Sequence, residues 1–339
     1  MSNEIKFPSS SELAIKLVLF SLIAVVLVFV IFKLKILIVC ILLSLTLASA
    51  MTPIAEFAEK RNVSRLFAVL GVYLVGGLVY GACAMLLAPL FLEQWHKLSG
   101  NLPGYFAALD VWQQKLLNLS SASTDSSLFD FADLSSLSLR VVRQTLDMTS
   151  GLLGLIANSI LVLFLAAYFV IEAKSIWTAI FKWLPKRWAL RLEPMIMPVA
   201  SRMGGYVRGQ ILVASAVALF LILCFSLIKL KYALVLGVLA GLLNLVPFVG
   251  SFIACSVAAV VAFNQMPILA LAVLLIYAIE QWIESTFMVP HLVGKQASLH
   301  PLIVLLSIIA GATLMGMLGA LISIPVAAAT VYLAEEFYL

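Results

Sequence analysis

Long apolar runs alternate with short polar stretches along most of this chain. Six runs approach the length of a membrane-spanning helix: residues 13–32, 36–51, 66–92, 152–171, 211–228 and the apolar first part of 267–301. A helix needs about 20 apolar residues to cross a hydrocarbon core of about 30 Å. The runs lack the alternation of a barrel strand, and lipid accepts only helices and closed barrels. The pattern therefore predicts an all-α integral membrane protein.

Two further apolar segments, 232–263 and 301–333, are too long for one untilted span. Residues that break helices interrupt both: Asn244, Pro247 and Gly250 in the first, and Gly311, Gly316, Gly319 and Pro325 in the second. Each segment is therefore expected to be either a kinked crossing or a re-entrant hairpin of two half-helices. Paired broken helices also point to a transporter's binding site, because they free backbone groups to face a ligand.

Proline and glycine residues give two structural predictions for the N-terminal spans. Pro53 follows the second apolar run and is expected to end that helix. Gly77 and Gly81 have the spacing that allows two membrane helices to approach closely, although they could equally be ordinary small residues.

A polar section, 93–150, divides the chain. Its apolar residues recur at three- and four-residue steps, which predicts an amphipathic helix: Tyr105, Leu109, Trp112, Leu116 and Leu119. A serine-rich turn, 120–127, and a weaker amphipathic segment, 128–148, follow. We therefore expect N-terminal spans at 1–92, an extramembrane section at 93–150 and a transport core at 151–339. The extramembrane section could be a small lobe, a hairpin on the membrane or an oligomer contact.

Composition and charge support a membrane location and give it an orientation. Hydrophobic residues make up 64% and charged residues 11%, against about 25% charged residues in soluble domains. Section 173–210 has one acidic residue, Glu193, and these basic residues: Lys174, Lys182, Lys186, Arg187, Arg191, Arg202 and Arg208. The positive-inside rule predicts that this section and the N-terminus are cytoplasmic and that 93–150 is outside. We therefore attribute the net charge of +5 to basic residues that set the membrane topology, and we expect no nucleic acid partner.

Glu280 and Glu284 are the main candidate functional residues. They are the only acidic residues between Gly209 and residue 334. A carboxylate inside a membrane segment costs about 2.5 to 3.5 kcal/mol, so its presence suggests a function. A spacing of four residues places both carboxyls on one helix face, where they could share a proton. Glu284 is therefore interpreted as a proton or cation carrier, or alternatively as a hydrogen-bonded structural residue.

Three other polar residues are weaker candidates. Arg208 begins the fifth span and could hold an anionic group, pair with a glutamate or snorkel to the headgroups. Asn244 lies at a helix break whose free carbonyls could face an ion. His300 precedes Pro301 and could exchange a proton or simply pack at a helix start. The four cysteines lie in apolar runs without metal-ligand spacing, so neither a metal nor a cofactor is expected.

Several motifs of the C-terminal half occur together in one order. They are YVRGQ (206–210), LLNLVPFVGSFIA (242–254), EQWIESTFMVPHLVGK (280–295), LHPL (299–302) and IPVAA (324–328). In combination they resemble the autoinducer-2 exporter family of bacterial membrane transporters. The resemblance implies about eight membrane segments in the bacterial inner membrane. From the prolines and glycines of this half we also expect helix-break or gating residues at Pro247, Gly250, Pro290, Gly294, Pro301, Gly316, Gly319 and Pro325.

The family resemblance also suggests which molecules the protein transports. At one residue the chain departs from the sequence pattern of the family. Family members are named for exporting a small sugar-like signal used in quorum sensing, and some resemble sodium/proton antiporters. Many members place an aspartate where this chain has Asn244. Any coupling of transport to an ion is therefore expected to depend more on Glu284.

The leading hypothesis is a secondary transporter. It would export an autoinducer-2-like molecule or exchange Na⁺ or Li⁺ for H⁺. We expect it to be embedded in the lipid bilayer and to form a homo-oligomer. The alternative is a membrane scaffold or lipid-organising protein that transports nothing. An enzyme is not expected, because the chain lacks a GxSG nucleophile motif and intramembrane aspartates, and it also lacks the GxxxxGK[ST] loop of an ATPase.

Overall fold

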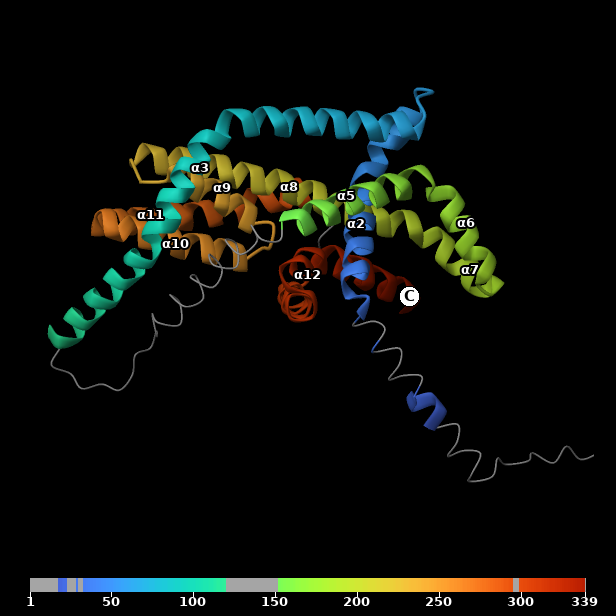
Figure 1. Cartoon of the computed structure of the whole chain (residues 1–339). Coiled ribbons are helices and arrows are strands. Elements are labelled where there is room, and N and C mark those ends of the chain that lie inside the picture. The colour runs from blue at the N-terminus through green and yellow to red at the C-terminus, as the bar shows by residue number, and fades with distance from the viewer. Residues whose placement is uncertain (1–17, 23–28, 30–32, 120–151, 295–298, 339) are drawn as a thin grey trace, which may run out of the picture.

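The computed structural model describes residues 18–22, 29, 33–119, 152–294 and 299–338. These residues form helices joined by short loops, without strands (Figure 1). Four of the described helices are long and apolar enough to cross a membrane, or up to five if a bent pair counts as one span. The all-α membrane fold is thus confirmed, with fewer full-length spans among these residues than the expected eight. The expected first span, 13–32, lies largely outside the described residues, and segment 128–148 lies entirely outside them.

Three helices form the N-terminal part: α2 (Lys35–Glu59), α3 (Arg65–Leu119) and α5 (Leu152–Ile171). α5 coincides with the expected fourth span. α2 packs against the other two helices around a small apolar cluster that consists of Ala48, Met51, Ala55, Val69, Ala166 and Val170. Hydrogen bonds also fix α5: Ser44 Oγ donates to the backbone oxygen of Val162 (3.1 Å), and Tyr73 Oη donates to that of Leu163 (2.7 Å).

Two expected helix ends are wrong. Pro53 does not end α2, which continues to Glu59 with the proline inside it. The third helix does not end at residue 92 but continues to Leu119. Its continuation has a physical reason, since it buries Leu98, Leu102 and Phe106 in the main core.

Gly77 and Gly81 do not bring helices together within the described chain. A Cβ atom added at either residue would meet no atom within 4 Å. Their expected role in close helix approach is therefore not fulfilled inside this part of the chain.

The basic section begins with a sharp bend. α6 (Ala173–Trp183) leaves α5 at an angle of 79°, and it is followed by α7 (Lys186–Leu192) and the 3₁₀ turn η1 (Glu193–Met195). We call residues 173–192 the arm, which projects at one side of the molecule (Figure 1). α8 (Ile196–Leu227) follows and starts well before the expected fifth span at residue 211.

The broken segment 232–263 is a helical hairpin rather than a kinked crossing. α9 (Ala233–Leu243) and α10 (Val249–Gln265) flank a break at 244–248. Gln265, at the far end of α10, donates from Nε2 to the backbone oxygen of Lys229 and accepts from the backbone N–H of Lys231, both at 2.9 Å. The outer ends of the two helices therefore lie together, and the break forms the tip of the hairpin.

The segment 301–333 also folds back on itself. Helix α12 (Pro301–Tyr338) reverses at Gly316, whose φ of 65° and ψ of −151° are not helical. A Cβ atom at Gly311 would lie 2.4 Å from the backbone oxygen of Gly319. Eight residues of straight helix would separate these positions by about 12 Å, so the backbones of two antiparallel halves touch here.

The remaining helix carries the two glutamates. α11 (Pro267–Ile283) continues without a break into a π-helical segment, η2 (Glu284–Val293), which ends at Gly294 with a φ of 64°. α11 packs against α10, and η2 packs against α8.

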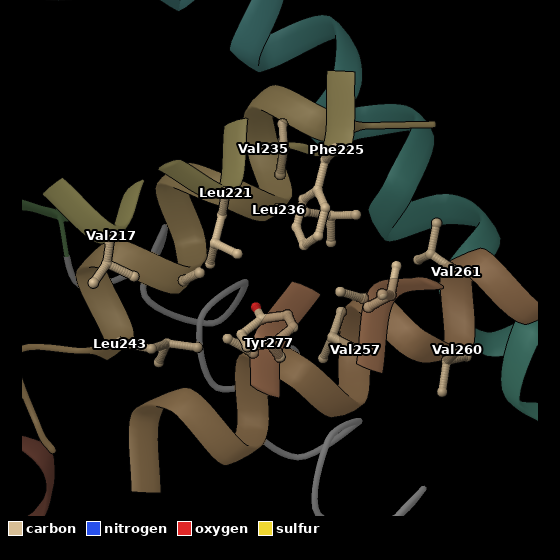
Figure 2. Packing of buried hydrophobic residues seen from close by; sticks show 14 of the residues in the cluster. Val217, Leu221, Phe225, Val235, Leu236, Leu243, Val257, Val260, Val261 and Tyr277 are labelled. Atoms are coloured by element: carbon tan, nitrogen blue, oxygen red, sulfur yellow. The ribbon is translucent and has the colours of Figure 1, made fainter. Parts of the chain in front are cut away.

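The main apolar core fills the space between α8, the α9–α10 hairpin and α11 (Figure 2). Leu221 and Phe225 of α8 point toward Val235 and Leu236 of α9. The ring of Tyr277, from α11, lies 6.0 Å from that of Phe225. The outer part of the hairpin is thereby held against the C-terminal half of α8 and against α11.

Candidate functional site

Four buried polar side chains from three elements meet at the tip of the α9–α10 hairpin. Asn244 and Ser251 come from the hairpin, Gln210 from the middle of α8 and Glu284 from the start of η2. Asn244 is 0% exposed and Glu284 is 5% exposed. Apolar residues surround them, so each polar group needs a partner inside the protein.

Asn244 is the centre of this cluster. Its Nδ2 donates to Glu284 Oε2 at 3.0 Å, and its Oδ1 accepts from Ser251 Oγ at 2.8 Å. Its backbone oxygen accepts from Gln210 Nε2 at 2.7 Å. The two side-chain partners together fix the orientation of the amide, because the carboxylate only accepts and takes the NH₂ group, while the serine hydroxyl donates to the amide oxygen.

The sequence of the tip explains why the helix stops at Asn244. Pro247 cannot continue a helix that needs its N–H. The N–H of Val249 donates to the backbone oxygen of Pro247 (2.8 Å), and Phe248 between them has a φ of 64° and a ψ of −58°. This geometry is a classic γ-turn, a rare and strained conformation. Gly250 is required as well, since its Cβ would lie 1.8 Å from the backbone oxygen of Leu243.

Glu280 is more deeply buried than Glu284 and is bonded differently. It is 1% exposed, and neither of its carboxyl oxygens has a hydrogen-bond partner among the described residues. The hydroxyls of Tyr206 and Tyr277 are buried without a partner there too. Glu280 lies in the last turn of α11 and Glu284 at the start of η2, and both are buried.

A close helix contact positions the π-helical segment. A Cβ atom at Gly209 would lie 2.5 Å from the backbone oxygen of Leu292, so only glycine allows α8 to approach η2 this closely. Short π-helical segments occur often at functional sites. The contact places Gln210, the neighbour of Gly209, beside the hairpin tip.

Arg208 bonds to α2 and forms no ion pair with Glu280 or Glu284. Its Nη1 donates to the backbone oxygens of Ala50 (2.8 Å) and Ser49 (3.5 Å) in α2. Pro53 explains this contact, because it lacks the N–H that would otherwise bond to the oxygen of Ser49. Gly204 permits the approach, since its Cβ would lie 2.1 Å from that oxygen.

His300 also lies outside the cluster. Its Nδ1 accepts from the backbone N–H of Leu302 at 3.3 Å, and its backbone oxygen accepts from Ile303 and Val304. These bonds place it at the start of α12, where Pro301 takes the first helical position that suits proline.

The expected helix-break residues lie in different elements of the fold. Pro247 and Gly250 build the tip of the first hairpin, and Gly316 and Gly319 build the second. Pro290 lies inside η2, and Gly294 ends it. Sequence reasoning did not single out Gln210 and Ser251 as members of the cluster, although both are polar residues inside apolar runs.

One cavity lies beside the cluster, and a second cavity adjoins the first. The smaller, of about 210 Å³, is lined by Tyr206 and Gln210 of α8 together with apolar residues of α2, the hairpin tip and α12, including Pro325. The larger, of about 730 Å³, lies between α2, α5 and the turn of α12 at Gly316. Leu43 and Val162 line both cavities, so the two adjoin.

Comparison with known proteins agrees with this architecture. The sequence model described as AI-2E family transporter matches residues 19–338. The chain belongs to the AI-2E transporter family. Bacillus subtilis "Putative transport protein YrrI" is 25% identical over 304 residues, which cover 85% of this chain and 83% of that protein. Synechocystis "Putative transport protein sll0063" is 28% identical over 286 residues (80% and 70%). Escherichia coli "Putative permease PerM" is 24% identical over 252 residues (72% and 71%).

Membership of the AI-2E family gives the cluster its context. The family and the names of its relatives indicate a multi-pass membrane transporter or permease. In such a protein, a buried carboxyl bonded to the tip of a helical hairpin lies where broken helices commonly form a transport site.

Proposed function

We propose that this AI-2E family protein is a secondary transporter in which Glu284 is the coupling carboxyl. It exports a small polar molecule of the autoinducer-2 type or exchanges Na⁺ or Li⁺ for H⁺. One observation carries the proposal: the 3.0 Å hydrogen bond between Glu284 and Asn244 joins the glutamate helix to the tip of a broken helix.

This bond gives the carboxyl a way to act on the hairpin. A carboxylate accepts hydrogen bonds at both oxygens, whereas a protonated carboxyl has one oxygen that donates. A cation on the carboxylate competes with Asn244 for the same lone pairs. The contact between Glu284 and the tip therefore depends on what the carboxyl holds, and a ligand shifts a conformational equilibrium only through such differential contacts.

Gln210 and Ser251 complete the proposed coupling unit. Gln210 ties the backbone of Asn244 to α8, and Ser251 orients the amide toward Glu284. Glu280 lies one turn away on the same face and is available to exchange a proton with Glu284. Arg208 and His300 are left outside the unit because their bonds are to α2 and to the start of α12.

The test is ion-driven proton flux in proteoliposomes, comparing the wild type with Glu284→Gln. We expect flux driven by Na⁺ or Li⁺ to fall at least about tenfold in the variant, since a general acid-base group of this kind contributes about 10²–10⁴-fold where it carries the proton. Glu93→Gln is the matched control, because Glu93 is exposed and, within the described part of the chain, bonded only to Lys97 on the same helix. Its flux should equal that of the wild type.

Other outcomes of these transport measurements would identify the cargo or contradict the proposal. If the wild type moves no protons but exports a labelled autoinducer-2-type molecule, and Glu284→Gln abolishes that export, the exporter form is supported. Equal transport of both cargoes by the wild type and Glu284→Gln would exclude the glutamate as the coupling residue. Absence of transport by a folded wild type would favour the scaffold alternative.

A further inference from the structure

The arm is a surface that the transport site does not use. Its two helices, α6 and α7, carry five basic residues and no acidic residue: Lys174, Lys182, Lys186, Arg187 and Arg191. Lys174, at its base, pairs with Glu59 of α2 at 3.0 Å. The cations toward the tip, Lys182, Lys186 and Arg187, have no carboxylate within 4 Å among the described residues.

Large apolar side chains stand exposed beside these cations. Trp183 is 90% exposed, Leu190 is 74% exposed and Trp188 is 42% exposed. Tryptophan has an apolar body and a polar edge, and it is enriched where a membrane meets water. Cations interleaved with such side chains are typical of segments that lie on an anionic bilayer.

The direction of α6 fits a position on the membrane surface. The helix leaves α5 at 79°, so it runs nearly in the membrane plane if α5 crosses the bilayer. A transmembrane course would place Lys174 and Lys182 in hydrocarbon, which is costly. The arm therefore stays at the depth where α5 ends.

The two faces of α6 differ in the way an interfacial helix requires. One face is open and carries Lys174, Thr178 and Lys182 together with Trp183. The other, with Trp177 and Phe181, lines an apolar cleft of about 250 Å³ together with residues of α2, α8 and α12. Basic side chains thus stand next to an apolar cleft, an arrangement that matches the phosphate and acyl chain of a lipid better than the surface of an acidic protein.

We propose that the arm binds anionic phospholipid at the surface of the cytoplasmic leaflet. Lys182, Lys186 and Arg187 contact the phosphate groups, and the side chains of Trp183 and Leu190 enter the boundary between headgroups and acyl chains. This function is separate from the coupling at Glu284 and does not depend on it.

The experiment uses the full chain in bilayers that contain phosphatidylcholine and phosphatidylglycerol, with one of the two lipids brominated at a time. Quenching of the tryptophan emission that Trp183→Phe removes reports the lipids next to the tip. We expect brominated phosphatidylglycerol to quench this emission more strongly than brominated phosphatidylcholine at equal mole fraction. Each cation near the surface contributes about fivefold to the local preference, so the triple variant K182E/K186E/R187E should lose it.

Controls keep the result interpretable. Lys231→Glu reverses one charge just beyond the opposite end of α8 and should leave the preference unchanged. If the triple variant fails to fold, the wild type alone suffices, because high salt should weaken a preference due to charge. Equal quenching by the two lipids in the wild type, or an unchanged preference in a folded triple variant, would overturn the proposal. Binding of the arm to an acidic protein without any lipid preference would overturn it as well.

Discussion

Asn244 illustrates how one side chain sets the charge of a buried cluster. Its amide donates to Glu284 and accepts from Ser251, which an ionised aspartate at the same position could not do. An aspartate would instead place two carboxylates about one hydrogen bond apart, where like charges oppose each other. The amide therefore leaves Glu284 as the one acid that bonds directly to the hairpin tip.

Ser251→Ala tests the orientation of this amide. The change leaves Asn244 Oδ1 buried without its donor, and an unsatisfied buried acceptor costs about 1–3 kcal/mol. We expect the free energy of unfolding in detergent to fall by that amount, and transport to fall with it. Ser256→Ala is the control on the same helix, because Ser256 is half-buried and, among the described residues, bonds only to the backbone oxygen of Phe252. Equal stability of the two variants would contradict the orienting role of Ser251.

The sequence reveals the glutamates but not their partners. Two acids inside an apolar run stand out in any hydropathy pattern, and their four-residue spacing predicts a shared face. The partners of Asn244 lie 34 residues away at Gln210 and 40 residues away at Glu284, and nothing in the local sequence encodes these distances. Only the packing of the hairpin tip against α8 and η2 brings the residues together.

At the scale of elements, a proline inside one helix and an arginine on another form a single joint. Pro53 leaves the backbone oxygen of Ser49 without its helical donor, and Arg208 of α8 donates to it and to the next carbonyl. Because the side chain satisfies the freed carbonyl, α2 continues past its proline. The same bonds hold α2 and α8 together.

A double-mutant cycle measures this joint. Arg208→Ala should destabilise the protein by about 1.5–3 kcal/mol, the range for hydrogen bonds to a charged group. Pro53→Ala supplies the missing N–H to Ser49, so Arg208→Ala should cost less in that background. Thermal unfolding in detergent gives both values, and Arg61→Ala, at an exposed arginine stacked on Phe57, serves as the control. Identical costs in the two backgrounds would show that the arginine does not compensate for the proline.

Hydropathy predicts the helices well and their ends less well. The run 152–171 coincides with α5, and both expected breaks, near Asn244 and Gly316, are present. The ends at Pro53 and residue 92 are wrong because tertiary partners override local signals: a guanidinium at Ser49 and a buried face beyond residue 92. The choice between kink and hairpin depends on contacts such as those of Gln265, which no local pattern contains.

At the scale of the whole molecule, the C-terminus returns to the side of the arm. Phe337 lies 6.1 Å from the ring of Trp188, and Glu335 lies 3.7 Å from Arg202 near the start of α8. The outer ends of the α9–α10 hairpin lie at the other end of α8, beside Lys229 and Lys231. The arm, the start of α8 and the C-terminus therefore lie on one side of the protein, and the outer ends of the α9–α10 hairpin lie on the other side.

This arrangement predicts where each side can be labelled. In a background without the four native cysteines, Met266→Cys should react in intact spheroplasts with a thiol reagent that does not cross membranes. Lys182→Cys, in the arm, should react only after lysis. Met266 is exposed and immediately follows the hairpin. Protection of Met266→Cys until lysis would contradict the predicted orientation of the hairpin.

The two hairpins also change how the crossings of the bilayer are counted. A hairpin adds none, whereas a kinked crossing adds one, so replacing two crossings by two hairpins alters the total by an even number. A reporter fused to the C-terminus would therefore read the same side in both arrangements. Only the segment between the hairpins, from residue 264 to residue 300, is inverted, and a reporter has to be placed inside it to distinguish them.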